Sequence, residues 1–95
     1  MRIYVSGPMT GLPEKNYPAF KIATANLRAD GHEVYCPSEY KNDDRTFNLR
    51  EAFTEYSAFI CTADAVYMLR GWERSLGARA EHALATALGL DIQYA

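Results

Sequence analysis

The chain of 95 residues has few cysteines, and this shortage excludes two classes of small protein. Two cysteines cannot form the disulfide framework that holds small secreted domains together, and they lack the CxxC pairing typical of zinc sites. We therefore expect Cys36 and Cys61 to be reduced, buried thiols in a cytoplasmic protein. The sequence indicates neither a metal nor another cofactor.

Long apolar segments are also absent. The longest apolar run is the five residues Ala65 to Leu69, whereas a membrane-spanning helix needs about 20. The chain opens with Met1 and Arg2, which lead directly into Ile3 and not into a basic and then apolar leader. We therefore expect no contact with a membrane and no secretory signal.

No charge of one sign dominates. Ten Lys and Arg residues oppose twelve Asp and Glu residues, which gives a net charge of −2, and the basic residues are scattered. A protein that binds nucleic-acid polymers normally carries a basic patch or stripe, so we exclude such a partner. A single domain over residues 1–95 remains. A chain this short buries only about 60–68% of its extended surface, so a partner subunit would help to stabilise it.

What the sequence contains is an alternation of strand and helix patterns. β-branched and aromatic runs predict strands, and apolar residues at helical spacing predict the segments between them. Strands separated by single helices run parallel with right-handed crossovers, which predicts an α/β fold with helices on both faces. The expected strands are 2–7, 33–36, 65–69 and 90–94, and the expected helices are about 16–30, 48–60 and 75–88.

Caps and periodicity define the helices further. Asn48, with Glu51 completing a capping box, and Ser75 are N-cap residues, while Gly31 ends the first helix. Inward-facing residues are expected to be Phe20, Ala23, Thr24 and Leu27 in the first helix, Leu49, Phe53, Tyr56 and Ile60 in the second, and Leu76, Ala80, Ala83, Leu84 and Ala87 in the third.

Ligands of open parallel sheets bind beyond the carboxyl ends of the strands, which places loops 6–16, 37–47 and 70–75 at the expected site. The first loop contains Ser6, Gly7, Met9, Thr10 and Gly11. Its glycines and hydroxyls suit an anion such as phosphate, but its spacing is neither GxGxxG nor a P-loop. A phosphate-binding loop and a plain tight turn both remain open.

The start of the third helix is more informative. Gly77 lies in its first turn, where glycine costs about 1 kcal/mol of helix stability, so a ligand that approaches closely would explain it. Glu81 lies one turn later on the same face, either as a nucleophile or base or as a solvated glutamate. His82 points about 100° away and suits a surface or interface position. Trp72 either covers the site or fills a subunit interface, and Asp64 suits a turn.

Three segments together resemble a known family. MRIYVSGPMTGLPEKNYPAF, GHEVYCP and AVYMLRGWERSLGARAEHALATALGL are similar to small phage and bacterial proteins that resemble the nucleoside 2-deoxyribosyltransferase superfamily. That superfamily includes the 2′-deoxynucleoside 5′-phosphate N-hydrolases. The resemblance covers nearly the whole chain and implies a flavodoxin-like Rossmann three-layer sandwich, often dimeric, with active sites shared between subunits.

The resemblance also implies residue roles. Ser75, Gly77 and Glu81 match a S-x-G-x-x-x-E pattern whose glutamate attacks the anomeric carbon, and Tyr4 matches the tyrosine that orients it. Tyr56 stands where the superfamily carries an aspartate that serves the leaving base or the sugar, with Glu55 beside it. The residues that correspond to the phosphate-binding positions of the hydrolases are Ser6, Gly7, Met9, Thr10, Gly11 and Ser75.

We therefore expect cleavage of the N-glycosidic bond, or base exchange, on a deoxyribonucleoside 5′-monophosphate or related nucleoside, with Glu81 as nucleophile. The tyrosine at position 56 favours an alternative, a non-catalytic module that binds or sequesters a nucleotide. In both cases the expected partner is a small molecule, and the expected assembly is a homodimer.

Overall fold

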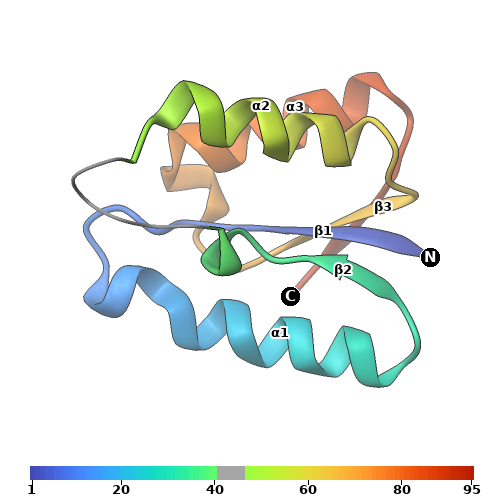
Figure 1. The fold of residues 1–95 in the computed structure, drawn as a ribbon, viewed down its shortest axis with the longest axis horizontal. Coiled ribbons are helices and arrows are strands. Elements are labelled where there is room, and N and C mark those ends of the chain that lie inside the picture. Colours follow the sequence, from blue (N-terminus) through green and yellow to red (C-terminus); the bar gives the residue numbers. More distant parts are fainter. Residues whose placement is uncertain (41–46) are drawn as a thin grey trace.

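A computed structural model, which describes residues 1–40 and 47–95, shows one parallel sheet between two helical layers (Figure 1). The strand order is β2-β1-β3-β4, which matches the first four positions of the flavodoxin-like order. The prediction of an α/β fold with parallel strands is confirmed. The strands are β1 (Arg2–Ser6), β2 (Glu33–Tyr35), β3 (Ala65–Met68) and β4 (Asp91–Tyr94), and the helices are α1 (Tyr17–Ala29), α2 (Leu49–Ile60) and α3 (Leu76–Ala87).

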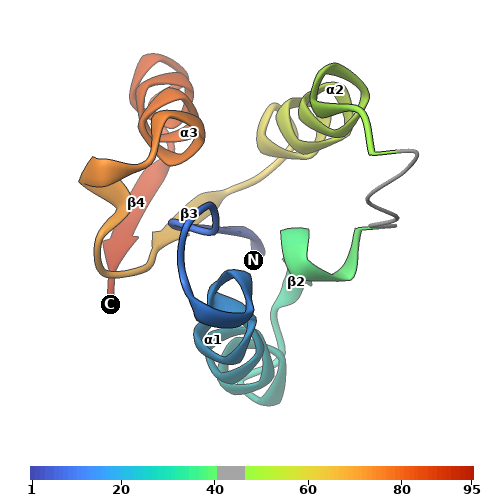
Figure 2. The ribbon, with the colours of Figure 1, turned by 90° about the vertical axis from the view of Figure 1, so that its left-hand side faces the viewer.

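The helices divide unequally between the two faces. Figure 2 shows α1 on one face of the sheet and α2 with α3 on the other. Alternation along β1 serves both layers: Tyr4 packs in the core under α2 and α3, whereas Val5 packs with Phe20 of α1. Because Ser6 follows Tyr4 by two positions, both side chains face the layer of α2 and α3.

Short turns connect these elements. In the part of the chain that the structure describes, a 3₁₀ turn follows each of the first three strands: η1 (Pro13–Asn16), η2 (Pro37–Glu39) and η3 (Trp72–Arg74). The remainder of the polar loop predicted over 37–47 lies outside the described residues from 41 to 46. The loops after β1 and β3 therefore meet at the carboxyl edge beside the switch in strand order between β1 and β3.

The predicted helix caps are present. The Asn48 side chain accepts a hydrogen bond from the Glu51 N–H (3.1 Å), and the Ser75 hydroxyl accepts one from the Ala78 N–H (3.2 Å). Gly31, just after α1, has a φ of +92°, in the left-handed region that glycine adopts without strain. These local signals explain why the helix boundaries fall within one or two residues of the predicted ones.

The predicted inward face of α3 is wrong. Leu76 is 82% exposed, and the buried residues of the helix are Ala78, Glu81 and Ala85. The physical reason is that α3 turns a glutamate inward, because hydroxyl groups of β1 compensate for its burial. The other residues predicted to face inward that are exposed are Ala80, Ala83 and Ala87 of α3 and Leu49 of α2.

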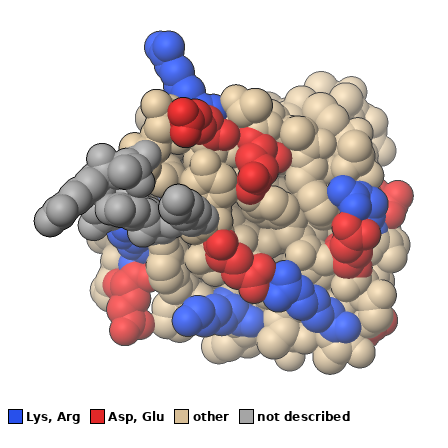
Figure 3. All heavy atoms as spheres, viewed as in Figure 1, with Lys and Arg blue, Asp and Glu red and all other residues tan. Residues whose placement is uncertain are grey.

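One cysteine prediction is also wrong. Cys36 is buried, with its Sγ 2.9 Å from the Ser38 hydroxyl, but Cys61 is exposed because it follows the last turn of α2. Across 1–40 and 47–95, no helix is both long and apolar enough to cross a bilayer. Figure 3 shows acidic and basic side chains interspersed over one face of the molecule, as the scattered charges of the sequence predict.

Candidate active site

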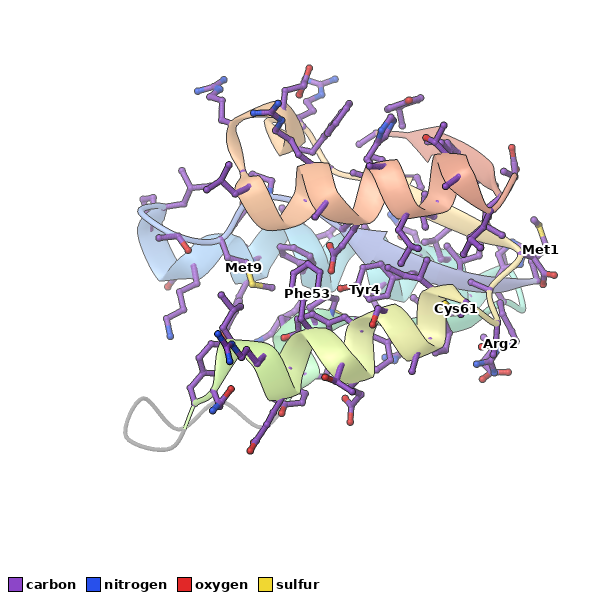
Figure 4. All side chains as sticks on the ribbon, turned by 90° about the horizontal axis from the view of Figure 1, so that it is seen from above. Met1, Arg2, Tyr4, Met9, Phe53 and Cys61 are labelled. Carbon is purple, nitrogen blue, oxygen red and sulfur yellow. The ribbon has the colours of Figure 1, made fainter. Side chains whose placement is uncertain are left out.

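The site centres on a buried carboxylate. Tyr4 and Ser6 of β1 each donate a hydrogen bond to Glu81 of α3, the first to Oε2 (2.5 Å) and the second to Oε1 (2.6 Å). Tyr4 and Ser6 are fully buried and Glu81 is only 6% exposed. Figure 4 shows Tyr4 between the ribbons of α2 and α3. Each carboxylate oxygen therefore has its own hydroxyl donor, which holds the carboxylate in one orientation.

Burial governs the ionisation of this group. It raises the pKa of Glu81 to about 7, while the hydrogen bonds from Ser6 and Tyr4 act in the opposite direction. Burial, and then the Glu81 charge, raise the pKa of Tyr4 well above its ordinary value, so its phenol stays protonated as a donor. The carboxyl group thus changes between its protonated and ionised forms near neutral pH, and carboxyl groups with pKa values shifted this far are frequent at functional sites.

Tyr56 of α2 lies beside this carboxylate. Its ring centroid is 6.1 Å from that of Tyr4, and burial, followed by the Glu81 charge, raises its pKa to about 12. Glu55 is placed differently, because it is exposed and accepts a hydrogen bond from the Tyr35 hydroxyl, whose ring stacks on Tyr4 at 5.5 Å. Tyr56, one of the two residues expected to serve a leaving base, therefore lies where the charge of Glu81 acts on it.

Aromatic side chains form one wall of the site. Phe53 packs against Tyr56, with centroids 6.1 Å apart, and Tyr40 packs edge-on against Tyr56 at 5.5 Å. Figure 4 shows Phe53 near Tyr4, between the ribbons of α2 and α3, whereas Met9 packs against the cluster of Val5 and Phe20 on the α1 face. Such a wall suits a planar or sugar ring, which aromatic faces contact through dispersion and the ring quadrupole.

The two glycines of the first loop have structural explanations. A Cβ on Gly7 would lie 2.7 Å from the Cβ of Leu69, so only glycine allows the loop to approach β3. Gly11 has a φ of +81° and open space around it. Thr10 is exposed and Met9 half-buried. The hydroxyl of Ser6, predicted as a phosphate ligand, is instead engaged with Glu81.

The first turn of α3 lies against Phe53, and its glycine is half-buried. The Ser75 hydroxyl caps the helix, and a Cβ on Gly77 would meet only Phe53 Cε2 at 3.6 Å and the Ser75 Oγ at 3.9 Å. These are ordinary contact distances and no left-handed φ is required, so the protein itself does not demand glycine there. Glycine at this position omits a methyl group that would contact Phe53.

Trp72 and His82 form a second aromatic group. The imidazole stacks on the indole, with centroids 4.2 Å apart and an interplanar angle of 15°, and its Nε2 lies 2.9 Å from the Tyr94 hydroxyl. This arrangement fixes η3 and the end of β4 to α3. Asp64 has the turn position expected of it, since its carboxylate accepts a hydrogen bond from the Arg2 N–H (2.7 Å).

Sequence reasoning missed the partnership of Ser6 with Glu81. The signal was present as the two-residue spacing of Tyr4 and Ser6 in a strand, which places both hydroxyls on one face. The spacing does not show which face of α3 turns toward β1, because that rotation is determined by packing. Where the structure describes the chain, no group of three or more His, Cys, Asp or Glu residues is placed to hold a metal ion.

The fold and the site together define an α/β protein with a buried carboxylate, held by two hydroxyls, at the strand-order switch. The chain belongs to the family described as a domain of unknown function (DUF4406), whose model matches residues 1–94. No curated protein matches the sequence.

Solved structures share the fold. A 2-deoxyribosyltransferase from Bacillus psychrosaccharolyticus matches with a TM-score of 0.79 at 22% identity, over 99% of this chain and 71% of that one. A 2-deoxyribosyltransferase from Leishmania mexicana gives 0.75 at 18% identity, over 98% and 62%. A conserved protein from Enterococcus faecalis V583 gives 0.73 at 19% identity, over 99% and 62%. This chain therefore spans 62–71% of the length of these structures.

Proposed function

We propose that the protein cleaves or exchanges the N-glycosidic bond of a deoxyribonucleoside or its 5′-monophosphate, with Glu81 as nucleophile. The single observation that carries this proposal is the buried Glu81 carboxylate held by Tyr4 and Ser6. The shared fold supports it, because two of the similar structures are 2-deoxyribosyltransferases. A solvated helix glutamate would have neither the burial nor the two donors.

The proposed reaction is a double displacement. An ionised Glu81 oxygen attacks C1′ as the bond to the base breaks, and a deoxyribosyl ester forms with the protein. Water or a second base then attacks C1′ from the opposite side and loses a proton, which replaces the one that left with the first base; this restores the carboxylate and retains configuration over the two steps. Tyr4 and Ser6 orient the carboxylate throughout, so little reorganisation is needed before attack.

The leaving base needs a proton or a hydrogen bond as its bond to C1′ breaks. Tyr56 is the favoured group, since its raised pKa keeps the phenol protonated and it lies close enough to sense the Glu81 charge. Glu55 supports the aromatic wall through Tyr35. For a substrate that carries a 5′-phosphate, the N-terminal end of α3 beside half-buried Gly77 would receive the phosphate, because a helix N-terminus favours an anion.

The test is release of free base from a panel of deoxyribonucleosides and their 5′-monophosphates, measured by chromatography with and without a second base. We expect turnover by the native protein, and a loss of more than a thousandfold in Glu81→Gln, which removes the nucleophile with almost no change in shape. Glu51→Gln, at an exposed position of α2, is the matched control and should retain activity. Full turnover by Glu81→Gln would contradict the mechanism.

A second function is favoured by one observation. Tyr56 occupies the position where the resembled superfamily carries an aspartate, and a phenol is a far weaker acid than a carboxyl group. A module that binds a nucleotide without cleaving it would need no such acid. Calorimetric titration with the same panel separates the two functions, because binding without base release supports the module and base release supports the enzyme.

A further inference from the structure

The structure contains a cavity of about 430 Å³ that the site at Glu81 does not use. It lies at the carboxyl edge and is lined by residues 68–74 with Tyr94 and Ala95, so Tyr4, Ser6 and Glu81 are not among its walls. In Figure 2, η3 and the end of β4 lie at the opposite side of this edge from α2. Its volume falls in the range of small-ligand pockets, roughly 300–1,000 Å³.

The charged side chains of this cavity are mainly basic. Arg70 and Arg74 contribute two guanidinium groups against one carboxylate, Glu73, although the protein as a whole is acidic. Neither arginine makes an ion pair with any residue in 1–40 or 47–95. Two arginines that flank a cavity without carboxylate partners are suited to a phosphate, which a guanidinium binds through two parallel hydrogen bonds.

The wall beside these arginines is aromatic and fixed. Trp72 is held by its stack on His82, which in turn contacts the Tyr94 hydroxyl at 2.9 Å. Gly71 turns the chain between Arg70 and Trp72 with a φ of +87°, a conformation that other residues adopt only with strain. The indole is thus arranged before any ligand arrives, which lowers the entropy that binding must overcome.

We infer that this cavity, formed around Arg70, Trp72 and Arg74, is a second binding site that takes a small phosphomonoester, such as a sugar phosphate or a mononucleotide. The guanidinium groups bind the phosphate and the indole contacts the attached ring. The inference does not depend on the chemistry proposed at Glu81, because the two sites share no side chain.

The experiment uses Trp72 as its own probe, since it is the only tryptophan of the chain. Its fluorescence is followed while the full chain is titrated with inorganic phosphate, ribose 5-phosphate or ribose. We expect saturable changes with ribose 5-phosphate, weaker binding of phosphate alone and none with ribose. A change with ribose alone, or none with ribose 5-phosphate, would overturn the inference.

Variants locate the binding site. Arg70→Ala/Arg74→Ala should weaken ribose 5-phosphate binding by roughly tenfold or more, while Arg50→Ala/Arg79→Ala removes the same charge elsewhere and should change it less than about twofold. Arg70→Lys/Arg74→Lys keeps the charge without the paired donors and should bind with intermediate affinity. Glu81→Gln should bind as the native protein does. An equal loss of affinity for ribose 5-phosphate in both double-alanine variants, or a loss of this affinity in Glu81→Gln, would contradict a separate site.

Discussion

Glu81 is a carboxyl group whose burial works against its charge, and this has a measurable effect on stability. Its pKa rises from an ordinary 4.5 to about 7 on folding, so the folded chain holds a proton that the unfolded chain releases. The contribution of Glu81 to the free energy of unfolding is therefore greatest below pH 4.5 and falls as the pH rises through 7. At a pH above the pKa of folded Glu81, the free energy of unfolding is lower by about 3 kcal/mol.

The first prediction follows for Glu81→Gln, whose neutral amide has the same shape. At pH 8 this variant should be more stable than the native protein by up to about 3 kcal/mol, and at pH 4 the two should be nearly equal. Urea unfolding at both pH values measures the difference. A pH-independent gap, or a destabilised variant at pH 8, would show that burial does not disfavour the charge of this carboxylate.

Ser6 supports the charged form, so the second prediction is that Ser6→Ala raises the pKa of Glu81. Loss of a buried hydrogen bond to a charged group corresponds to roughly one pKa unit. Carbon-detected NMR titration of the Glu81 carboxyl measures this without any substrate, and the acidic limb of the activity profile should move by the same amount. Ser57→Ala, which removes a hydroxyl bonded to the Thr54 carbonyl of α2, is the control. Unchanged titration in Ser6→Ala would mean that the contact does not stabilise the carboxylate.

At the scale of elements, a substitution in the first turn of α3 should change stability and substrate affinity in opposite directions. The third prediction is that Gly77→Ala raises helix stability by up to about 1 kcal/mol, because a Cβ fits there at ordinary contact distances. The same methyl group would lie against Phe53, at the helix end where the proposed phosphate binds, so substrate affinity should fall. Thermal unfolding and the KM for base release measure the two effects.

Gly7→Ala serves as the contrasting variant, since its Cβ would lie 2.7 Å from that of Leu69 and should destabilise the fold. If Gly77→Ala bound and processed substrate as well as the native protein, the ligand would not lie close to this turn. The two glycines therefore distinguish a residue kept for packing from one kept for access.

The elements were predictable because their signals are local. Strand runs, the caps Asn48 and Ser75, and Gly31 at the end of α1 depend on neighbours within a few residues, and the structure has all of them. The rotation of α3 was not predictable. Alanines and leucines lie on both sides of this helix, so periodicity alone cannot show that the face with Glu81 turns inward. That choice is made by the hydroxyls of β1, which are more than 70 residues away in sequence.

The site was predictable in part. Glu81 was a candidate from its place one turn after Gly77, whereas the role of Tyr4 was implied by the family resemblance, and the structure brings the two together at 2.5 Å. Ser6 was assigned to a phosphate because hydroxyls in a loop suit anions, whereas its strand position commits it to the carboxylate. The aromatic wall needs the packing of α2 against β1 and β2, which no short motif records.

At the scale of the whole molecule, α3 leaves an apolar stripe uncovered. Leu76 is 82% exposed and is continued along the helix by Ala80, Ala83 and Ala87, spaced as one face. The fourth prediction is that the protein forms a homodimer through this stripe, with a solution mass twice the 10.7 kDa of the chain. Ala83→Glu should give monomers, because it places a charge in the middle of the interface.

Light scattering after size exclusion measures the mass. Ile22→Glu on α1, where the native side chain is also exposed, is the matched control and should remain dimeric. A monomeric native protein would contradict the predicted homodimer. A dimeric Ala83→Glu variant would show that the interface does not lie on this face of α3. A dimer would also bring the start of α3, and so the site, close to the partner subunit.

The proposed chemistry is tested most directly by looking for the deoxyribosyl ester on Glu81. The native protein is mixed with its substrate, quenched in acid and digested, and the peptide that contains Glu81 is examined by mass spectrometry. Our account predicts a deoxyribosyl adduct on that glutamate, formed as base is released and absent from Glu81→Gln. Release of base with no adduct, at an undiminished rate in Glu81→Gln, would contradict it.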